Sequence, residues 1–252
     1  MVLGIILAAG KGTRISSNGV NKTALPFNGK PMISYALDLY QETVDVTMVV
    51  VGAYADTLRE AIAPYKPLVC VQEEQLGTGH AVSVAMRDIA KAKIGDPELV
   101  IVGYGDHMMF YAPQTIKAMI ANHRKQQAAL SLVTALHDEP NALAWGRVIR
   151  NAQGHAVKVV EQKDATEAER QVQELNAGFY VFDYAFLKKY IDTLTKSPVS
   201  NEYYITDMIE RAVSNGYKVV PFTVPFSEVG IGVNTNEQLS ESQKLQTQYR
   251  NA

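Results

Sequence analysis

The first residues that could do chemistry form a glycine-rich loop near the start of the chain. Residues 4–14 read Gly-Ile-Ile-Leu-Ala-Ala-Gly-Lys-Gly-Thr-Arg, an apolar run of strand type that leads into small residues and two cations. Small residues let backbone N–H groups approach phosphate oxygens, and Lys11 and Arg14 can neutralise their charge. The loop matches neither the Walker motif nor the Gly-x-Gly-x-x-Gly dinucleotide fingerprint. Taken alone, it predicts either a triphosphate site or an ordinary turn between strand and helix.

A carboxylate follows a second apolar run. Residues 98–104 read Glu-Leu-Val-Ile-Val-Gly-Tyr, and Asp106 comes two positions later. Ligands in open α/β sheets bind at the carboxyl ends of strands, and Mg²⁺ prefers oxygen ligands. Asp106 is therefore a candidate metal ligand, with a plain turn residue as the alternative. The five histidines have no zinc-site spacing, so we expect structural or surface roles for them.

The elements that must position these residues alternate along the first half of the chain. Apolar runs predict strands over residues 2–7, 44–52, 68–72 and 98–104, and helical periodicity predicts helices over 31–40, 55–63 and 78–89. Repeated strand–helix units predict an α/β fold, with a mostly parallel sheet and helices on both faces.

The second half has a different rhythm, with fewer helices between its strands. Strands are expected over 129–135, 146–150, 156–162, 176–182 and 218–224, with a hairpin turn at 151–154. Helices are expected over 204–214 and 236–249, and most of 163–173 reads as a solvated helical face. We expect this half to extend or cover the sheet edge and to form the acceptor side of a cleft.

Composition limits the possible partners and compartments. The 252 residues are 47% hydrophobic with a net charge of −2, so a sizeable core is expected and no basic surface indicates nucleic-acid binding. The single cysteine, Cys70, lies in an apolar stretch and cannot form a disulfide within the chain. The N-terminus lacks a signal-peptide pattern, and no apolar run approaches membrane-spanning length. We therefore expect a cytoplasmic protein that binds no membrane; the oligomeric state is not determined by the sequence.

A series of short motifs gives the chain a more specific interpretation. It resembles the N-terminal uridylyltransferase domain of the bifunctional N-acetylglucosamine-1-phosphate uridylyltransferase/glucosamine-1-phosphate acetyltransferase family of sugar-1-phosphate nucleotidylyltransferases. The motifs occur in the family's order and cover nearly the whole chain: LAAGKGTR at 7–14, Lys22 with GKPM at 29–32, QEEQLGTGHA at 72–81, YGD at 104–106, WGR at 145–147, VEQKDATEAERQ at 160–171, LNAG at 175–178, NEYYITD at 201–207 and GVN at 232–234.

The resemblance implies a fold, a domain layout and a reaction. The fold would be a Rossmann-like sheet of the nucleotidyltransferase (GT-A-like) type with an acceptor-side β extension. Residues 1–235 would form the nucleotidyltransferase domain and 236–252 a C-terminal helix. No left-handed β-helix acetyltransferase domain is expected in these residues, so only the first of the family's two activities is implied. That activity is Mg²⁺-dependent uridylyl transfer from UTP to N-acetylglucosamine 1-phosphate, giving UDP-N-acetylglucosamine and pyrophosphate.

The same resemblance implies a role for each matching residue. Arg14 and Lys22 would be catalytic cations that hold the leaving pyrophosphate, and Asp106 and Asn234 would bind the metal. The nucleotide site would comprise Leu7, Ala8, Gly10, Lys11, Gly12, Gln72, Gln75, Gly77 and Thr78. The sugar site would comprise Gly146, Glu161, Asn176, Glu202 and Tyr204. The two glutamines suit a uracil edge because an amide both donates and accepts hydrogen bonds.

Four departures from the family pattern keep alternatives open. The spacing from Arg14 to Lys22 is one residue longer, which affects the path of residues 16–20, and His107-Met108-Met109 replaces the usual Val-Pro-Leu. Trp145 stands for a tyrosine and Ala177 for a threonine, both expected near the acceptor pocket. One alternative is a nucleotidylyltransferase for another sugar phosphate or phosphorylated acceptor. The other is a non-catalytic module that binds nucleotide sugars.

Overall fold

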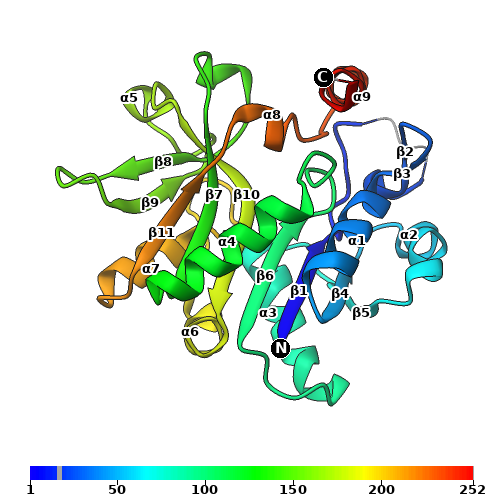
Figure 1. Ribbon diagram of the computed structural model, residues 1–252, viewed down its shortest axis with the longest axis horizontal. Helices are drawn as coiled ribbons and strands as arrows, with labels where there is room; N and C mark the ends of the chain where they lie inside the picture. Colours follow the sequence, from blue (N-terminus) through cyan, green and yellow to red (C-terminus); the bar gives the residue numbers. More distant parts are fainter. Residues whose placement is uncertain (16–18, 252) are drawn as a thin grey trace.

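The computed structural model describes residues 1–15 and 19–251, and a twisted sheet runs through its centre (Figure 1). Seven strands follow the order β11-β7-β10-β6-β1-β4-β5, and β8 and β9 extend this sheet from β10. Their bounds are β1 Val2–Leu7, β4 Val46–Val51, β5 Leu68–Val71, β6 Leu99–Tyr104, β7 Leu130–Leu136, β8 Arg147–Arg150, β9 Ala156–Val160, β10 Glu174–Asp183 and β11 Val219–Thr223.

Strand β1 lies in the middle of the sheet because all six of its residues are apolar or small and buried. It pairs in parallel with β4 on one side and β6 on the other, and β4 pairs in parallel with β5. A chain that leaves β1 toward β4 and later returns on the far side as β6 creates a topological switch point. The crevice at the carboxyl ends of β1 and β6 is where open α/β sheets bind ligands.

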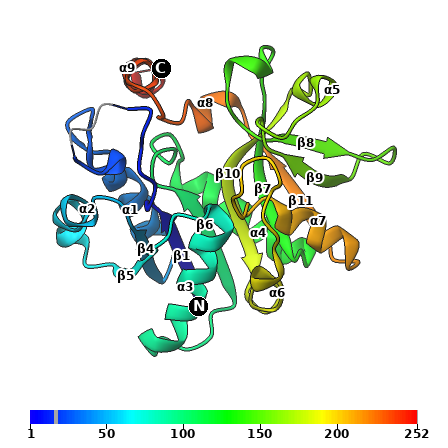
Figure 2. The ribbon, with the colours of Figure 1, turned by 180° about the vertical axis from the view of Figure 1, so that it is seen from behind.

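Helices cover both faces of the sheet, so the core has two layers. Leu3 and Ile5 of β1 alternate with Val2 and Ile6, and each pair packs against a different set of helices. One face carries α3 (Thr78–Ala92), α6 (Tyr184–Tyr190) and α7 (Asp207–Ser214), as seen in Figure 2. The other carries α1 (Met32–Thr43), α2 (Ala55–Ile62) and α4 (Pro113–Gln126), as seen in Figure 1.

The second half of the chain extends the sheet. Strand β10 is antiparallel to both neighbours, β6 and β7, and β11 joins β7 in parallel. The antiparallel hairpin β8–β9 turns at residues 151–154, where Gly154 adopts a left-handed φ of 80° and donates to Asn151 O. It projects from the main sheet in Figure 1 and pairs with β10 through Arg147 and Leu175.

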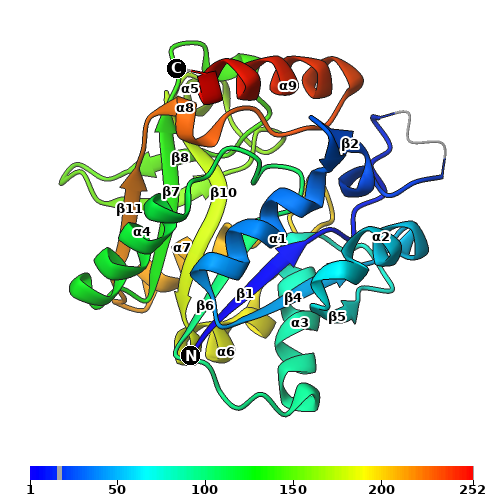
Figure 3. The same ribbon diagram turned by 45° about the vertical axis from the view of Figure 1, so that its right-hand side comes forward.

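Short elements complete the part of the chain that the structure describes. They are the ribbon β2 (Pro26–Phe27) with β3 (Lys30–Pro31), the helices α5 (Glu167–Arg170) and α8 (Phe226–Val229), and the 3-10 turns η1 (Lys22–Ala24), η2 (Ala63–Tyr65), η3 (Pro140–Ala142) and η4 (Ile191–Thr193). The last helix, α9 (Asn236–Asn251), lies across the top of the molecule in Figure 3 and is tied to the loop at Met109 by Gln246. None of the described helices is long and apolar enough to span a bilayer.

The predicted α/β fold with a mostly parallel sheet is confirmed, and every predicted strand is present within a few residues of its expected bounds. Three helices, α4, α6 and α8, were not predicted. Helix α4 did carry a signal, since Ile116, Met119, Ile120 and His123 form a buried stripe after Pro113 at the first turn. The helix expected over 204–214 begins only at Asp207. Of the doubtful path over residues 16–20, residues 16–18 lie outside the described part of the chain.

Candidate active site

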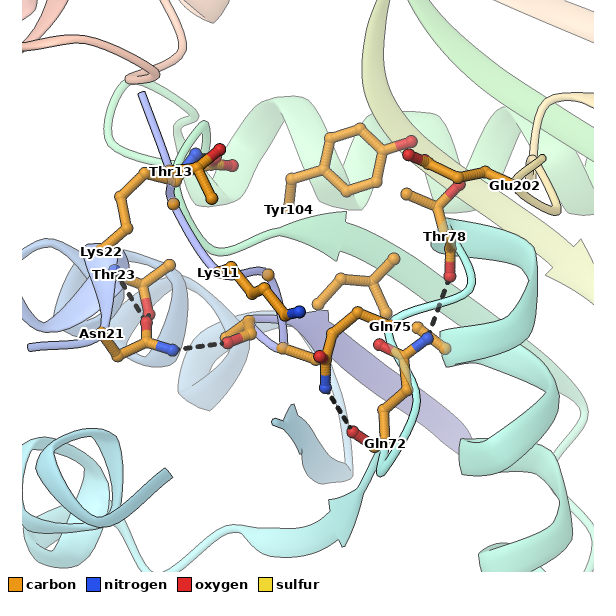
Figure 4. A pocket seen from close by; sticks show the side chains of 18 of the residues that line it. Lys11, Thr13, Asn21, Lys22, Thr23, Gln72, Gln75, Thr78, Tyr104 and Glu202 are labelled. Carbon is orange, nitrogen blue, oxygen red and sulfur yellow. Dashed lines mark hydrogen bonds and ion pairs between the residues drawn. The ribbon is translucent and has the colours of Figure 1, made fainter. Parts of the chain in front are cut away.

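A cleft of about 960 Å³ opens at the carboxyl ends of β1 and β6, the switch point of the sheet (Figure 4). It brings together the glycine-rich loop, the segment 72–78 and the turn after β6. Fourteen residues predicted from the sequence line it: Leu7, Ala8, Gly10, Lys11, Gly12, Arg14, Lys22, Gln72, Gln75, Gly77, Thr78, Asp106, Glu202 and Asn234. These comprise every predicted catalytic, nucleotide and metal residue, with Glu202 from the predicted sugar site.

The two predicted cations and the two predicted metal ligands form one network. Lys22 Nζ makes an ion pair with Asp106 and donates a hydrogen bond to Asn234 Oδ1 at 3.1 Å. Arg14 donates to the same oxygen at 3.2 Å. The side chains of Lys22 and Asp106 are only 13% and 20% exposed, so water screens their interaction weakly. Two oxygens from residues 128 positions apart in the sequence thus converge on one ammonium group.

Residue Asn21, which the sequence analysis missed, holds Lys22 in place. It is fully buried, and its Nδ2 donates to the backbone oxygens of Ala8 and Ala53, both at 2.9 Å. Its Oδ1 caps η1 by accepting from Thr23 N at 2.9 Å and Thr23 Oγ1 at 2.8 Å. One side chain therefore ties the end of β1, the start of α2 and the turn that carries Lys22. No sequence motif marks such a residue.

Glycine allows the glycine-rich loop to lie close to Lys22. Gly12 has a left-handed φ of 59°, and a Cβ there would lie 3.0 Å from Lys22 Cβ. Within the described residues, the backbone N–H groups of residues 10–14 have no hydrogen-bond partner. A run of free N–H groups beside Lys11, Arg14 and Lys22 is suited to bind an anion with several oxygens.

The opposite wall of the cleft carries the two predicted glutamines. Gln72 is 3% exposed, and its Nε2 donates to Gly77 O at 3.1 Å. Gln75 Nε2 donates to the backbone oxygens of Gln72 at 2.9 Å and Glu73 at 3.2 Å. Both amide nitrogens are thus used within the protein, and Figure 4 shows the Gln72 amide oxygen on the side that faces the cleft.

Helix α3 begins at this wall and is tied to the acceptor side. Gly77 precedes the helix with a φ of 107°, and a Cβ there would lie 2.5 Å from Tyr203 O. Gly79 N donates to Tyr203 O at 2.8 Å, and Thr78 Oγ1 accepts from Ile205 N at 3.0 Å. This junction places Glu202 at the rim of the cleft.

Four of the five predicted sugar residues do not line the cleft. These are Gly146, Glu161, Asn176 and Tyr204. Asn176 Nδ2 donates to Tyr180 Oη at 2.7 Å, and Tyr180 Oη lies 3.3 Å from Tyr104 Oη, which does line the cleft. Tyr104 is the first residue of the YGD motif at 104–106, and the sequence predicted no role for it. The roles of Gly146, Glu161, Asn176 and Tyr204 in sugar binding stay a prediction.

Glu161 and Tyr204 lie further along the acceptor side. Glu161 accepts a hydrogen bond from Thr206 Oγ1 at 2.9 Å, and burial raises the pKa of its carboxyl above the ordinary value. Gly146 is beside it, since a Cβ on that glycine would lie 3.6 Å from Glu161 Oε1. Tyr204 lines a second cavity of about 340 Å³, whose wall includes Asp164 and Asp207.

Apart from the longer spacing between Arg14 and Lys22, the departures from the family pattern do not line the cleft: His107, Met108, Met109 and Ala177 are buried, and Trp145 is half-buried against the core. Ala177 is 1% exposed and packs in the layer with α1, α2 and α4, and its backbone oxygen accepts from Tyr111 Oη at 3.2 Å. The rings of His107 and Trp145 are 4.5 Å apart. Burial lowers the pKa of His107 to about 4, so this ring is neutral at physiological pH.

Comparisons with known proteins show which family the chain is similar to. The model of the nucleotidyl transferase family matches residues 3–229. A relative named Bifunctional protein GlmU, from Exiguobacterium sp., is 38% identical over 248 residues, covering 98% of this chain and 53% of the relative. One of the same name from Geotalea daltonii is 36% identical over 246 residues, covering 97% of this chain and 52% of the relative. The chain thus spans about half the length of the curated relatives it matches.

A solved structure shares the fold. It is provisionally assigned as a glucose-1-phosphate thymidylyltransferase from Bacillus anthracis, and it was crystallised with sucrose. The TM-score is 0.75 at 18% sequence identity, covering 98% of this chain and 95% of the other. At this identity the likeness supports the architecture of the sheet and helices, and not the choice of substrate.

Proposed function

Because the chain belongs to the nucleotidyl transferase family, we propose that it transfers uridylyl from UTP to N-acetylglucosamine 1-phosphate. A phosphate oxygen of the sugar phosphate attacks the α-phosphorus in line, and the bond from that phosphorus to the β-phosphate bridging oxygen breaks. UDP-N-acetylglucosamine forms and pyrophosphate leaves. Both reactants are anions, so positioning and neutralisation of charge are the main demands on the protein.

One observation carries the proposal: Arg14, Lys22, Asp106 and Asn234 meet at one end of the cleft. A module that only binds a nucleotide sugar does not need this set. We propose that Arg14 and Lys22 hold the phosphates of the leaving pyrophosphate, with Lys11 beside them. The free N–H groups of residues 10–14 would bind the same oxygens.

The residues present fit a magnesium ion. Asp106 and Asn234 offer a carboxylate and an amide oxygen, and both already contact a single cation, the Lys22 ammonium. The described residues contain no cluster of three His, Cys, Asp or Glu side chains that could hold a metal, and a Mg²⁺ site with substrate phosphates needs only one or two protein ligands. Asp106 and Asn234 would hold the Mg²⁺, which would neutralise charge on the phosphates.

The base would lie against the wall formed by Gln72, Gln75 and Gly77, and the acceptor beyond Glu202. Amide oxygens that face the cleft suit a base with a ring N–H donor, which uracil has. The relatives named Bifunctional protein GlmU support this choice, as do the motifs at 72–81 and 201–207. We further propose that residues 1–235 form the catalytic domain, with α9 packed on it.

A pyrophosphate-release panel tests the proposal. UTP, dTTP, CTP, ATP and GTP are each offered with N-acetylglucosamine 1-phosphate, glucose 1-phosphate and glucosamine 1-phosphate, in the presence of Mg²⁺. We expect release with UTP and N-acetylglucosamine 1-phosphate, at least about tenfold above glucose 1-phosphate in kcat/KM, because one unpaired buried polar group accounts for that ratio. Equal use of both sugars would show a different acceptor. Binding of UDP-N-acetylglucosamine with no release from any pair would show a binding module instead.

A further inference from the structure

The amide of Gln72 has a fixed orientation in the cleft wall. Gly77 O can only accept a hydrogen bond, so the Gln72 atom 3.1 Å from it must be the NH₂ nitrogen. The same nitrogen lies 3.0 Å from His80 Nδ1. Because an amide nitrogen only donates, Nδ1 must accept, which places the ring proton of His80 on Nε2.

Both hydrogens of the Gln72 nitrogen are therefore used inside the protein. The amide oxygen is left over: it accepts no hydrogen bond from the described residues, and in Figure 4 it points to the cleft. An acceptor at this position matches the N3–H of uracil. Cytosine carries an unprotonated N3 there and would meet an acceptor with an acceptor.

The ring of His80 lies beside Tyr203, whose backbone is fixed by hydrogen bonds. His80 is in the first turn of α3, and its ring lies 6.4 Å from the Tyr203 ring at a tilt of 34°. The Tyr203 backbone is itself fixed on both sides, donating to Leu76 O and accepting from Gly79 N, each at 2.8 Å. His80 does not line the cleft, but its side chain contacts Gln72, which does.

From these contacts we infer that His80 is a positioning residue that sets base selectivity: it fixes the Gln72 amide with its oxygen toward the base, and so favours UTP over CTP. The inference rests on the proposed use of UTP. A rotated amide would place NH₂ toward the base, suited to cytosine N3, but would bring its oxygen against Gly77 O and would require the His80 proton to move from Nε2 to Nδ1. Removal of the His80 acceptor removes one of these two obstacles.

Two substitutions distinguish the effect of the hydrogen-bond acceptor Nδ1 from the effect of the aromatic ring of His80. His80→Phe keeps an aromatic ring beside Tyr203 but has no acceptor, whereas His80→Asn has no ring but places an oxygen near the position of Nδ1. The readout is the ratio of kcat/KM for UTP to that for CTP, with N-acetylglucosamine 1-phosphate as acceptor. We expect His80→Phe to lower the ratio by about threefold to tenfold, the range for one neutral hydrogen bond, and His80→Asn to keep it within about twofold.

A ratio that is kept in His80→Phe, or lost in His80→Asn, overturns the inference, and either variant alone decides if the other does not fold. A double-mutant cycle with Gln72→Met adds a second check: in that background His80→Phe should leave the ratio unchanged, because no amide remains to be oriented. A wild-type protein that shows no preference for UTP would overturn the proposed function as well. A wild-type preference that survives in His80→Phe would overturn only the role of His80.

Discussion

The substitution Asn21→Asp tests whether one buried amide positions the catalytic loop. The change keeps the volume and both contacts of Oδ1 with Thr23, but it replaces the donor that serves Ala8 O and Ala53 O. The buried oxygen of Ala8 and the partly buried oxygen of Ala53 then face an oxygen without a proton. At about 1–3 kcal/mol for each unsatisfied group, we expect a loss of roughly 2–6 kcal/mol in the free energy of unfolding at neutral pH. That is a large share of the 5–15 kcal/mol typical of a domain.

The pH dependence of this loss has a definite sign. The introduced carboxyl is buried at a position that is fully enclosed in the wild type, so burial raises its folded-state pKa above its unfolded value. The folded state then binds the proton more tightly, so the stabilising contribution of the protonated carboxyl is fully present below the unfolded pKa of about 3.9. Its stability relative to wild type is lost as the pH rises through the folded-state pKa. The penalty should therefore shrink on acidification toward pH 4.

Urea unfolding at pH 7, 5.5 and 4 measures the difference in free energy of unfolding between Asn21→Asp and the wild type. Pyrophosphate release at low temperature measures turnover of the folded fraction. We expect turnover to fall by about tenfold or more, since small displacements of a catalytic group are costly. Asn215→Asp is the matched control. Asn215 is exposed and its two side-chain hydrogen bonds join residues far from the cleft, so it should lose at most about 1 kcal/mol. A penalty for Asn21→Asp below about 0.5 kcal/mol, or one independent of pH, would refute the reasoning.

Three further predictions follow from the site and the core. Asp106→Asn should keep its thermal melting point and lose most turnover, because a charge is removed where the metal would bind; turnover within about tenfold of wild type at saturating Mg²⁺ would contradict the metal assignment. Arg147→Met should lower the free energy of unfolding, measured by urea denaturation, by roughly 2–5 kcal/mol, because this fully buried side chain donates to Pro140 O, Leu143 O and Trp145 O. An unchanged free energy of unfolding would show that the loop 140–145 does not depend on these hydrogen bonds. Burial lowers the pKa of His123 to about 4, so the unfolded state binds the proton more tightly and wild-type stability should fall from pH 6.5 to 4. His123→Leu should remove up to about 3 kcal/mol of that fall. Identical dependence of stability on pH in both proteins would refute this role of His123.

The cleft could be predicted from the sequence because its residues follow strand ends. The carboxyl ends of β1 and β6 share an edge of the sheet, and the loops after them bring Arg14 and Asp106 together. Asn234 comes from a turn far along the chain, and only the family resemblance indicated it. Periodicity could not place it, since no strand ends directly before it in the described structure.

Residues that position others were harder to predict. Asn21 acts through backbone atoms 13 and 32 positions away, and His80 acts through Gln72, so neither has a local pattern that reveals its partner. The late start of α7 has a similar cause. Residues before it are engaged with α3 and Glu161 through Ile205 N and Thr206 Oγ1, and these tertiary contacts override the local helical pattern.

The departures at His107 and Trp145 are best understood as one packing unit. In the sequence they are 38 positions apart, and Trp145 was expected near the acceptor pocket. In the structure the centroids of their rings are 4.5 Å apart, and the Trp145 ring also lies 5.9 Å from the Phe226 ring. This unit lies under the turn that carries the candidate metal ligands, where Gly232 packs over His107 and Val233 N donates to Asp106 O at 3.0 Å. With His107 in place of valine and Trp145 in place of tyrosine, the two rings change how that turn is supported, and neither side chain lines the cleft where a sugar would bind.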